Sequence, residues 1–220
     1  MSDRFGNKGF ARAGKPPRKT SAPQVIGLTG GLACGKSEVG RILARLGAAV
    51  LDTDEVTREL QRPGRPVFRA IARRFGRGVL TPEGELDRRA LARRVFADPR
   101  ARRALEALVH PAVYAEVERW IRARRRERRA AAVIVPLLYE TGRTKDWDAV
   151  WCVTAPKRSA MARLKRRGLT AAEAQARWAA QWPPSEKARR ADVVIRNNRS
   201  LDELEKKVRA LWNNRTREEP

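Results

Sequence analysis

Residues 25–37 read VIGLTGGLACGKS, a short apolar run followed by a glycine-rich turn that ends in lysine and serine. The apolar run predicts a buried strand. From Lys36 onward, apolar residues recur at helical spacing until Gly47, which supplies a helix end. The turn itself, Gly30 to Ser37, fits the pattern G-x-x-x-x-G-K-[ST], in which backbone N–H groups wrap phosphate oxygens and the lysine reaches the outer phosphates of a nucleotide. The sequence therefore predicts a phosphate-binding loop between a strand and a helix.

The rest of the chain continues to alternate strands and helices. Further apolar runs predict strands at residues 48–51, 133–138, 150–154 and 193–195. A strand, a loop, a helix and a second strand in this order form a βαβ unit. Repeated units of this kind favour an α/β fold with a doubly wound parallel sheet and helices on both faces, of the P-loop kinase type.

Composition and periodicity divide the chain into segments. Residues 1–23 hold six Lys or Arg against one Asp, with Gly and Pro between them, which predicts a disordered basic tail. Residues 62–129 show helical apolar spacing, which predicts a helical insertion. This insertion divides a nucleotide-binding core of residues 24–61 and 130–215. Within the second part of the core, we expect a helical hairpin at about residues 157–185 to form a lid.

Capping residues mark two helix starts. Asp98 followed by Pro99 predicts a capped start inside the insertion. Thr170 with Glu173 predicts a capping box for a lid helix that ends near Trp182. Both the insertion and the lid are therefore expected to be built from helices.

The formal net charge of +24 is the most unusual bulk property of the chain. It indicates attraction to polyanions, but it does not distinguish nucleic acid from polyphosphate ligands. The run Arg122–Arg129, six arginines around Glu127, is either a solvated helix end or a docking surface. We expect no specific nucleic-acid partner, although the charge allows non-specific binding of polyanions. The sequence leaves the oligomeric state open.

Cysteine usage and hydropathy bear on the compartment. Cys34 and Cys152 are far apart and lack metal-ligand spacing, and His110 is the single histidine, so we expect no metal site built from cysteine and histidine. The N-terminus has no apolar signal core, and no run approaches the ~20 apolar residues of a membrane span. We therefore expect a cytoplasmic protein with no membrane partner.

Two acidic residues, Asp52 and Asp54, follow the second predicted strand. Side chains two residues apart on a strand point to the same face, so both carboxylates can face the crevice in which open α/β sheets bind ligands. Two roles are open to them: holding Mg²⁺ together with the Ser37 hydroxyl, or accepting the proton of an acceptor hydroxyl during phosphoryl transfer. The alternative is that one of them caps a helix starting at Glu55.

These residues together resemble the dephospho-coenzyme A kinase family, from about residue 25 to residue 211. The markers, in order, are Leu28-Thr29-Gly30-Gly31, Asp52-Thr53-Asp54, Pro63-Gly64, Phe75-Gly76, Gly84-Glu85-Leu86-Asp87-Arg88, Leu108-Val109-His110-Pro111, Val135-Pro136-Leu137-Leu138 with Glu140, Arg163-Leu164, Ala179-Ala180-Gln181, and Ala191-Asp192 with Ile195 and Asn197. Many kinases share the loop, whereas the ordered combination is specific to this family.

The resemblance implies an activity. It implies phosphorylation of the ribose 3′-hydroxyl of dephospho-coenzyme A by ATP, with Mg²⁺, giving coenzyme A and ADP in the last step of coenzyme A biosynthesis. It makes the insertion of residues 62–129 the coenzyme-binding part, and it makes the hairpin of about residues 157–185 a lid that closes over ATP. Closure of such a lid would exclude water and limit wasteful hydrolysis.

The resemblance also assigns roles to individual residues. The residues assigned to the nucleotide phosphates are Ala33, Cys34, Gly35, Lys36, Ser37 and Glu38. Asp54 is the general base, with Lys36 and Arg163 as the other catalytic residues. Asp54, Asp87, Arg88 and His110 contact the acceptor, while Ser37 and Asp52 are the candidate metal ligands. For His110, an alternative stays open, in which it caps or packs a helix junction.

The loop departs from the family pattern at three positions. Ala33-Cys34 stands where relatives usually have glycine and a small residue, and Glu38 stands where threonine is common. Backbone cradling survives these changes because it uses N–H groups. Glu38 places a negative charge near bound phosphate, so we predict that it weakens nucleotide binding. Cys34, close to a helix N-terminus, is predicted to favour its thiolate and to be sensitive to oxidation.

Two other functions compete with this interpretation. A nucleoside or nucleotide kinase would share the loop and the acidic pair, but His110-Pro111 and Val135-Pro136-Leu137-Leu138 disfavour it. A nucleic-acid-binding module that uses ATP incidentally would show tight, strongly salt-dependent RNA binding by residues 24–215.

Overall fold

The computed structural model describes residues 24–217, so the predicted basic tail at residues 1–23 lies outside the described residues. Within this range one sheet is built from β1 (Val25–Gly30), β2 (Ala49–Asp52), β3 (Ala131–Ile134), β4 (Ala149–Thr154) and β5 (Val193–Arg196). The strands lie in the order β2-β3-β1-β4-β5, and every neighbouring pair is parallel. The predicted α/β fold with a parallel sheet is therefore confirmed.

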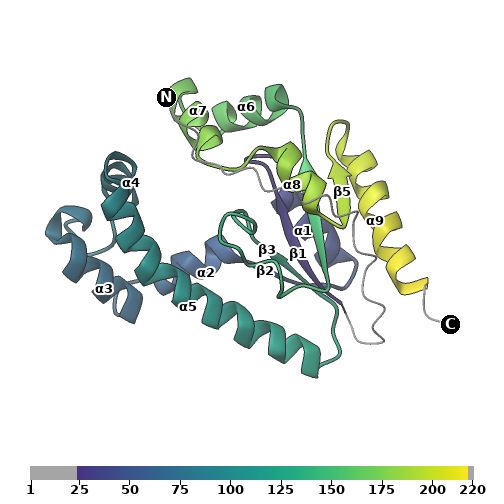
Figure 1. Cartoon of the computed structure of the whole chain (residues 1–220), viewed down its shortest axis with the longest axis horizontal. Coiled ribbons are helices and arrows are strands. Elements are labelled where there is room, and N and C mark those ends of the chain that lie inside the picture. Colours follow the sequence, from purple (N-terminus) through teal and green to yellow (C-terminus); the bar gives the residue numbers. More distant parts are fainter. Residues whose placement is uncertain (1–23, 218–220) are drawn as a thin grey trace, which may run out of the picture.

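Helices cover both faces of this sheet (Figure 1). They are α1 (Lys36–Arg45), α2 (Thr53–Leu60), α3 (Pro66–Phe75), α4 (Arg88–Ala97), α5 (Pro99–Arg126), α6 (Lys157–Arg166), α7 (Ala171–Ala179), α8 (Pro184–Arg190) and α9 (Leu201–Arg217), with a short 3₁₀ turn at Arg77–Val79. Successive strand residues point to opposite faces. Ile26 and Leu28 of β1 accordingly join the buried cluster of α1 and α9, whereas Val25 joins the cluster of α2, α3 and α5.

The helical insertion shares its interior with the sheet. Val67 and Ile71 of α3 and Val113 of α5 belong to the same buried cluster as Val133 of β3. Figure 1 shows α3, α4 and the long α5 standing to one side of the sheet, with α5 running back toward it. The predicted helical insertion is present, and it is packed against the sheet rather than separated from it.

The basic run at the end of α5 is anchored as well as solvated. Arg125 forms an ion pair with Asp148 at 2.9 Å, and the other oxygen of Asp148 accepts a 2.7 Å hydrogen bond from the backbone N–H of Val25. Arg124 lies over the ring of Trp120. Although α5 is 28 residues long, no helix within residues 24–217 is long and apolar enough to cross a bilayer.

Both predicted caps are confirmed. The Asp98 side chain accepts a 2.8 Å hydrogen bond from the N–H of Arg100 at the start of α5. Thr170 and Glu173 form a reciprocal capping box at the start of α7. Each cap satisfies N–H groups that the first turn of a helix cannot pair internally.

Two predicted boundaries next to prolines are wrong, and one alternative for His110 is removed. β3 ends at Ile134 instead of continuing to residue 138, because the chain turns at Pro136, which has no N–H for a ladder. The lid helix expected to end near Trp182 ends at Ala179, and a separate helix, α8, begins at residue 184. Pro111 lies inside the continuous helix α5, so no helix junction exists at this point for the neighbouring histidine to cap.

Candidate active site

A pocket of about 320 Å³ lies at the carboxyl ends of the strands, where open parallel sheets bind ligands. Its lining consists of the loop residues 32–38 and of residues from elsewhere in the chain: Arg41, Asp54, Pro136, Arg163, Arg167, Gln181, Asn197 and Leu201. The loop joins β1 to α1, as the motif predicted. The three predicted catalytic residues, Lys36, Asp54 and Arg163, therefore meet in one pocket.

The loop is shaped for an anion. Gly35 and Ala33 have φ values of 104° and 53°, in the left-handed region, so Ala33 adopts a conformation that glycine would adopt at lower cost. The Lys36 ammonium donates hydrogen bonds to the carbonyls of Gly31 at 2.9 Å and Gly30 at 3.2 Å. Burial lowers the pKa of Lys36. The N–H groups that open α1 lack an intrahelical acceptor, which makes this end of the pocket an anion site.

Asn197 and Pro184, which are distant from the loop in the sequence, lie directly against it. The buried side-chain amide of Asn197, just after β5, donates a 2.8 Å hydrogen bond to the carbonyl of Cys34. A Cβ on Gly35 would lie 2.3 Å from the Asn197 amide nitrogen, and a Cβ on Gly31 would lie 2.7 Å from Pro184. Glycine is required at both positions because of these close approaches. Asn197 is among the markers of the family resemblance, but its place against the loop was not predicted from the sequence.

The two acidic residues do not lie on one strand. Asp52 ends β2, whereas Asp54 lies in the first turn of α2, which begins at Thr53 rather than at Glu55. The Asp52 carboxylate caps α2 by accepting a 2.9 Å hydrogen bond from the N–H of Asp54. The capping alternative thus holds for Asp52, while Asp54 faces the pocket.

Asp54 has the electrostatic setting of a general base. Desolvation beside the loop raises the pKa of Asp54, and the neighbouring Asp52 charge raises it further. Lys36 and Arg58 act in the opposite direction. A carboxylate whose pKa is raised toward the working pH is a better proton acceptor than an ordinary aspartate.

Glu38 and Cys34, two of the loop residues that depart from the family pattern, each lie in a setting that reduces their negative charge. Glu38 forms an ion pair with Arg41, one turn later on α1, so its charge is balanced at the pocket wall. Cys34 is fully buried, and burial raises the pKa of its thiol although Lys36 and Arg163 act to lower it. The prediction that Cys34 favours its thiolate is therefore wrong, because desolvation outweighs the helix end and the nearby cations.

The α6–α7 hairpin packs directly on the phosphate loop. Ala33 joins a small buried cluster with Leu164 of α6 and Ala174 of α7. The Arg163 guanidinium donates a 3.0 Å hydrogen bond to the carbonyl of Ala33. Arg167, one turn later, also lines the pocket. Arg163, to which the resemblance assigned a catalytic role, and Arg167 are thus the hairpin arginines that line this pocket.

Three of the four residues predicted to contact the acceptor lie outside this pocket, whereas Asp54 lines it. Asp87, Arg88 and His110 do not line the pocket beside the loop. Asp87 caps α4 through two 2.9 Å hydrogen bonds from backbone N–H groups of its first turn. Arg88 donates a 2.7 Å hydrogen bond to Gln61, and the His110 ring lies 5.6 Å from the Tyr114 ring. Contacts of these side chains with an acceptor stay predictions.

One face of α2 connects the pocket with Arg88. Asp54, Arg58 and Gln61 recur at helical spacing and share that face. Besides its bond to Gln61, Arg88 donates a 3.5 Å hydrogen bond to the Arg58 carbonyl. Among residues 24–217, neither arginine has a carboxylate within ion-pair distance. Arg58 is absent from the residues predicted to form the site, and the only signal in the sequence is its position one turn after Asp54.

Comparisons with known proteins agree with this geometry. The family model described as Dephospho-CoA kinase matches residues 24–203. A dephospho-CoA kinase of Symbiobacterium thermophilum is 53% identical over 191 residues, which cover 86% of this chain and 80% of the relative. The crystal structure of a Thermus thermophilus protein superposes with a TM-score of 0.75 at 35% identity, covering 88% of this chain and 98% of that one. For the dephospho-CoA kinase of Campylobacter jejuni, the TM-score is 0.66 at 26% identity, with 86% and 95% covered. Since the family model spans most of the chain and includes the phosphate loop and the residues facing it, the chain belongs to the dephospho-CoA kinase family.

Proposed function

We propose that this kinase transfers the terminal phosphoryl group of ATP to the ribose 3′-hydroxyl of dephospho-coenzyme A, giving coenzyme A and ADP in the last step of coenzyme A biosynthesis. The observation that carries the proposal is the placement of Lys36 and Asp54 in the lining of one pocket beside the phosphate loop. A cation for the phosphates and a base for an alcohol are the two groups that this transfer requires.

The loop and the hairpin hold the triphosphate. N–H groups from residues 33–38 surround the phosphate oxygens, and Lys36 leaves its loop carbonyls to reach the outer phosphates. Arg163 and Arg167 add positive charge from the hairpin side. A second groove, of about 370 Å³, shares Asn197 with the pocket and continues to Arg199, which leaves room for the nucleoside part of ATP.

Magnesium fits the residues present. Among the described residues, no group of three or more His, Cys, Asp and Glu forms a complete metal cage. Mg²⁺ in kinases keeps several waters and takes phosphate oxygens, so one hydroxyl and one carboxylate from the protein suffice. Ser37 would supply the hydroxyl, and Asp52, through the oxygen that does not cap α2, the carboxylate. When bound, the ion would neutralise charge that develops on the phosphates.

Asp54 acts on the acceptor. Its carboxylate accepts the proton of the 3′-hydroxyl as the oxygen attacks the terminal phosphorus, and ADP leaves along the opposite direction. The raised pKa of Asp54 supports this role. The hairpin packs on the loop through Leu164 and Ala33, so its closure over ATP would limit the access of water to the same phosphorus.

The insertion of residues 62–129 binds the rest of the acceptor. Arg58 and Arg88, which lack carboxylate partners in the described chain, lie along the α2 face that starts at Asp54. The diphosphate of dephospho-coenzyme A is joined to the same ribose that carries the 3′-hydroxyl, so cations at this position suit it. We place Asp87 and His110 in support of this part, Asp87 through the cap that orients Arg88 at the start of α4.

A substrate panel tests the function. Purified protein is incubated with Mg·ATP and either dephospho-coenzyme A or a set of nucleosides and nucleotides, and ADP and product are measured by chromatography and mass spectrometry. ADP formation that depends on dephospho-coenzyme A and matches coenzyme A formation supports the proposal. Activity confined to a nucleoside would overturn it. Lys36→Ala should abolish transfer, whereas Lys145→Ala, at an exposed position before β4 that lines neither groove, serves as the control.

The compartment is part of the proposal. Cys34 and Cys152 are both free and buried, which fits a reducing environment, and we therefore place the enzyme in the cytoplasm.

A further inference from the structure

The most deeply buried charged side chain of the described residues is a lysine outside the phosphate loop. Lys187 on α8 is 0% exposed. Its ammonium donates a 2.8 Å hydrogen bond to the carbonyl of Pro136 and lies 2.7 Å from a carboxylate oxygen of Glu140. Lysine is rarely buried in full without such partners, because desolvating an ammonium is costly.

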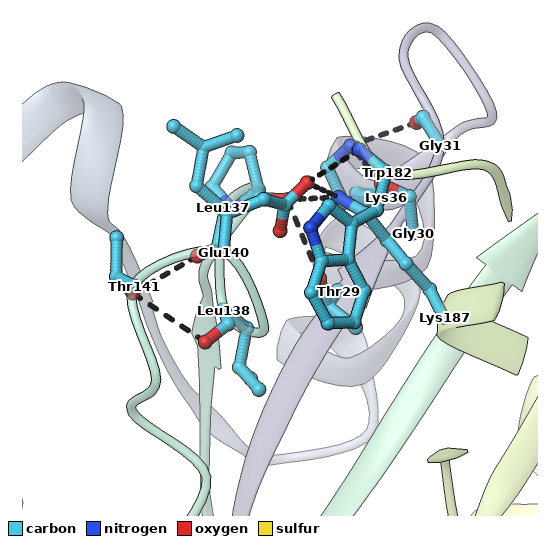
Figure 2. Close-up of polar contacts among 11 residues, drawn as sticks. Thr29, Gly30, Gly31, Lys36, Leu137, Leu138, Glu140, Thr141, Trp182 and Lys187 are labelled. Atoms are coloured by element: carbon cyan, nitrogen blue, oxygen red, sulfur yellow. Dashed lines mark hydrogen bonds and ion pairs between the residues drawn. The ribbon is translucent and has the colours of Figure 1, made fainter. Parts of the chain in front are cut away.

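Glu140 joins this lysine to the end of the hairpin. The same carboxylate oxygen that meets Lys187 accepts a 3.0 Å hydrogen bond from the backbone N–H of Trp182. Figure 2 shows the Glu140 carboxylate facing both Lys187 and Trp182, with Lys36 of the phosphate loop beside them. Lys187 is close enough to contribute to the lowered pKa of Lys36. The pair is thus adjacent to the phosphate pocket without lining it.

Three segments that shape the pocket meet at this pair. Pro136, whose carbonyl Lys187 holds, lines the pocket after β3. Gln181, directly before Trp182, lines it from the hairpin side. Pro184 begins the helix that carries Lys187 and packs on Gly31 of the phosphate loop. Residues 180–183 are the joint between α7 and α8, and the pair fixes this joint against the loop after β3.

Stability alone does not explain such a pair. Replacing a buried ion pair by apolar side chains of similar size often leaves the stability of a protein unchanged or raises it, because the cost of desolvating two charges offsets their attraction. Trp182 also stacks on Tyr139 at 6.3 Å and lies under Arg190 at 4.9 Å, so the joint has apolar and cation–π contacts without the pair. The pair adds a defined geometry, because Glu140 accepts a hydrogen bond from the N–H of Trp182 and Lys187 donates one to the carbonyl of Pro136.

We propose that Glu140 and Lys187 are positioning residues for phosphoryl transfer, which hold the α7–α8 joint and the loop after β3 so that Gln181 and Pro136 keep their places on the pocket wall. This inference rests on the proposed function for its transfer assay. Without the pair, the joint shifts, the hairpin closes less accurately over the terminal phosphate, and water competes with the acceptor.

Three variants separate positioning from folding. Lys187→Met and Glu140→Leu each leave one buried charge unpaired and should lower the Tm. The double variant removes both charges while keeping similar volume, and it should recover at least half of that loss. Glu186→Gln is the matched control, because Glu186 forms exposed ion pairs with Arg189 and Arg190 on the same helix. It should leave stability and activity unchanged.

Kinetics at a temperature well below the lowest Tm decide the outcome. In the double variant, we expect kcat for transfer to fall about tenfold or more, with KM for ATP changed less than threefold. We also expect the ratio of ATP hydrolysed to acceptor phosphorylated to rise about tenfold. A double variant that recovers wild-type kcat together with its Tm would show that the pair only stabilises the fold, and wild-type kcat in either single variant would also overturn the proposal.

The result can be distinguished from a failure of the proposed function. If the unmodified protein does not phosphorylate dephospho-coenzyme A, the transfer assay fails for every chain, including the Glu186→Gln control. In that case, the rate of ATP hydrolysis measured without acceptor can still be compared between the variants. A hydrolysis rate in the double variant equal to that of the unmodified protein would reject the positioning role on this second measurement.

Discussion

The side-chain amide of Asn197 donates a 2.8 Å hydrogen bond to the carbonyl of Cys34, and so connects the end of β5 with the middle of the phosphate loop. Both groups are buried, so water cannot replace either partner. The shape of the loop therefore depends on a residue far away in the sequence.

Removing this amide should loosen the loop without touching the catalytic groups. For Asn197→Ala we expect KM for ATP to rise about tenfold, because an unsatisfied buried carbonyl costs about 1–3 kcal/mol and the loop relaxes to avoid that cost. Steady-state kinetics at saturating acceptor measure the effect. Asn214→Ala, which alters an exposed side chain on α9 away from both grooves, is the control, and equal KM values for the two variants would contradict the prediction.

Replacing the proposed base should separate binding from turnover. Asp54→Asn keeps the shape of the side chain while removing its basicity, so we expect retained ATP binding with kcat lower by about 10² or more. Calorimetry gives the binding and a coupled ADP assay gives the turnover. In Asp52→Asn the side-chain amide oxygen still caps α2. Because one proposed Mg²⁺ ligand is weakened, the Mg²⁺ concentration that gives half-maximal activity should rise. Near-normal turnover of Asp54→Asn would reassign Asp54 to a structural role.

The charge at Glu38 should weaken nucleotide binding, but only modestly, because Arg41 pairs with it. Glu38→Thr is expected to lower the Kd for ATP about two- to fivefold, the effect of removing one anion near a helix N-terminus. In an Arg41→Met background, the same substitution should give a larger gain, since the carboxylate is no longer neutralised. Equal Kd values with and without Glu38 in both backgrounds would refute this account.

The two thiols should be unreactive in the folded protein. Burial raises the pKa of Cys152 to about 11 from its ordinary 9.0, and it also raises the pKa of Cys34. A raised thiol pKa means less thiolate at a given pH, about a hundredfold less for Cys152 at pH 8. Alkylation by iodoacetamide at pH 8, followed by mass spectrometry, should be at least about a hundredfold slower in the folded chain than in the unfolded one. Rapid labelling of Cys34 in the folded protein would contradict the expected burial.

Local sequence patterns were sufficient for the elements and for the loop. The motif from Gly30 to Ser37 places a strand, a turn and a helix in fixed order, and the caps at Asp98 and Thr170 depend on neighbours within one helical turn. For this reason, the phosphate loop, the parallel sheet and the insertion could be predicted without a structure.

Long-range packing could not be predicted in the same way. Nothing near Lys187 in the sequence indicates burial, because its helix reads PSEKARR and would be expected to face water. Its burial depends on Glu140, which arrives from the loop after β3. The prediction that Asp52 and Asp54 lie on one strand was wrong for a related reason. A strand pattern and a capped helix start overlap there, and only the backbone shows that the helix begins at Thr53.

The insertion and the sheet share one buried cluster, in which buried side chains of α3 and α5 lie with those of the strands they cover. Recombination between relatives therefore cannot exchange this segment as an independent module, because its removal would strip an entire face of the sheet. New acceptor specificities in this lineage should arise by point changes on exposed positions of α2 to α5, while the buried positions evolve together with those of β2 and β3.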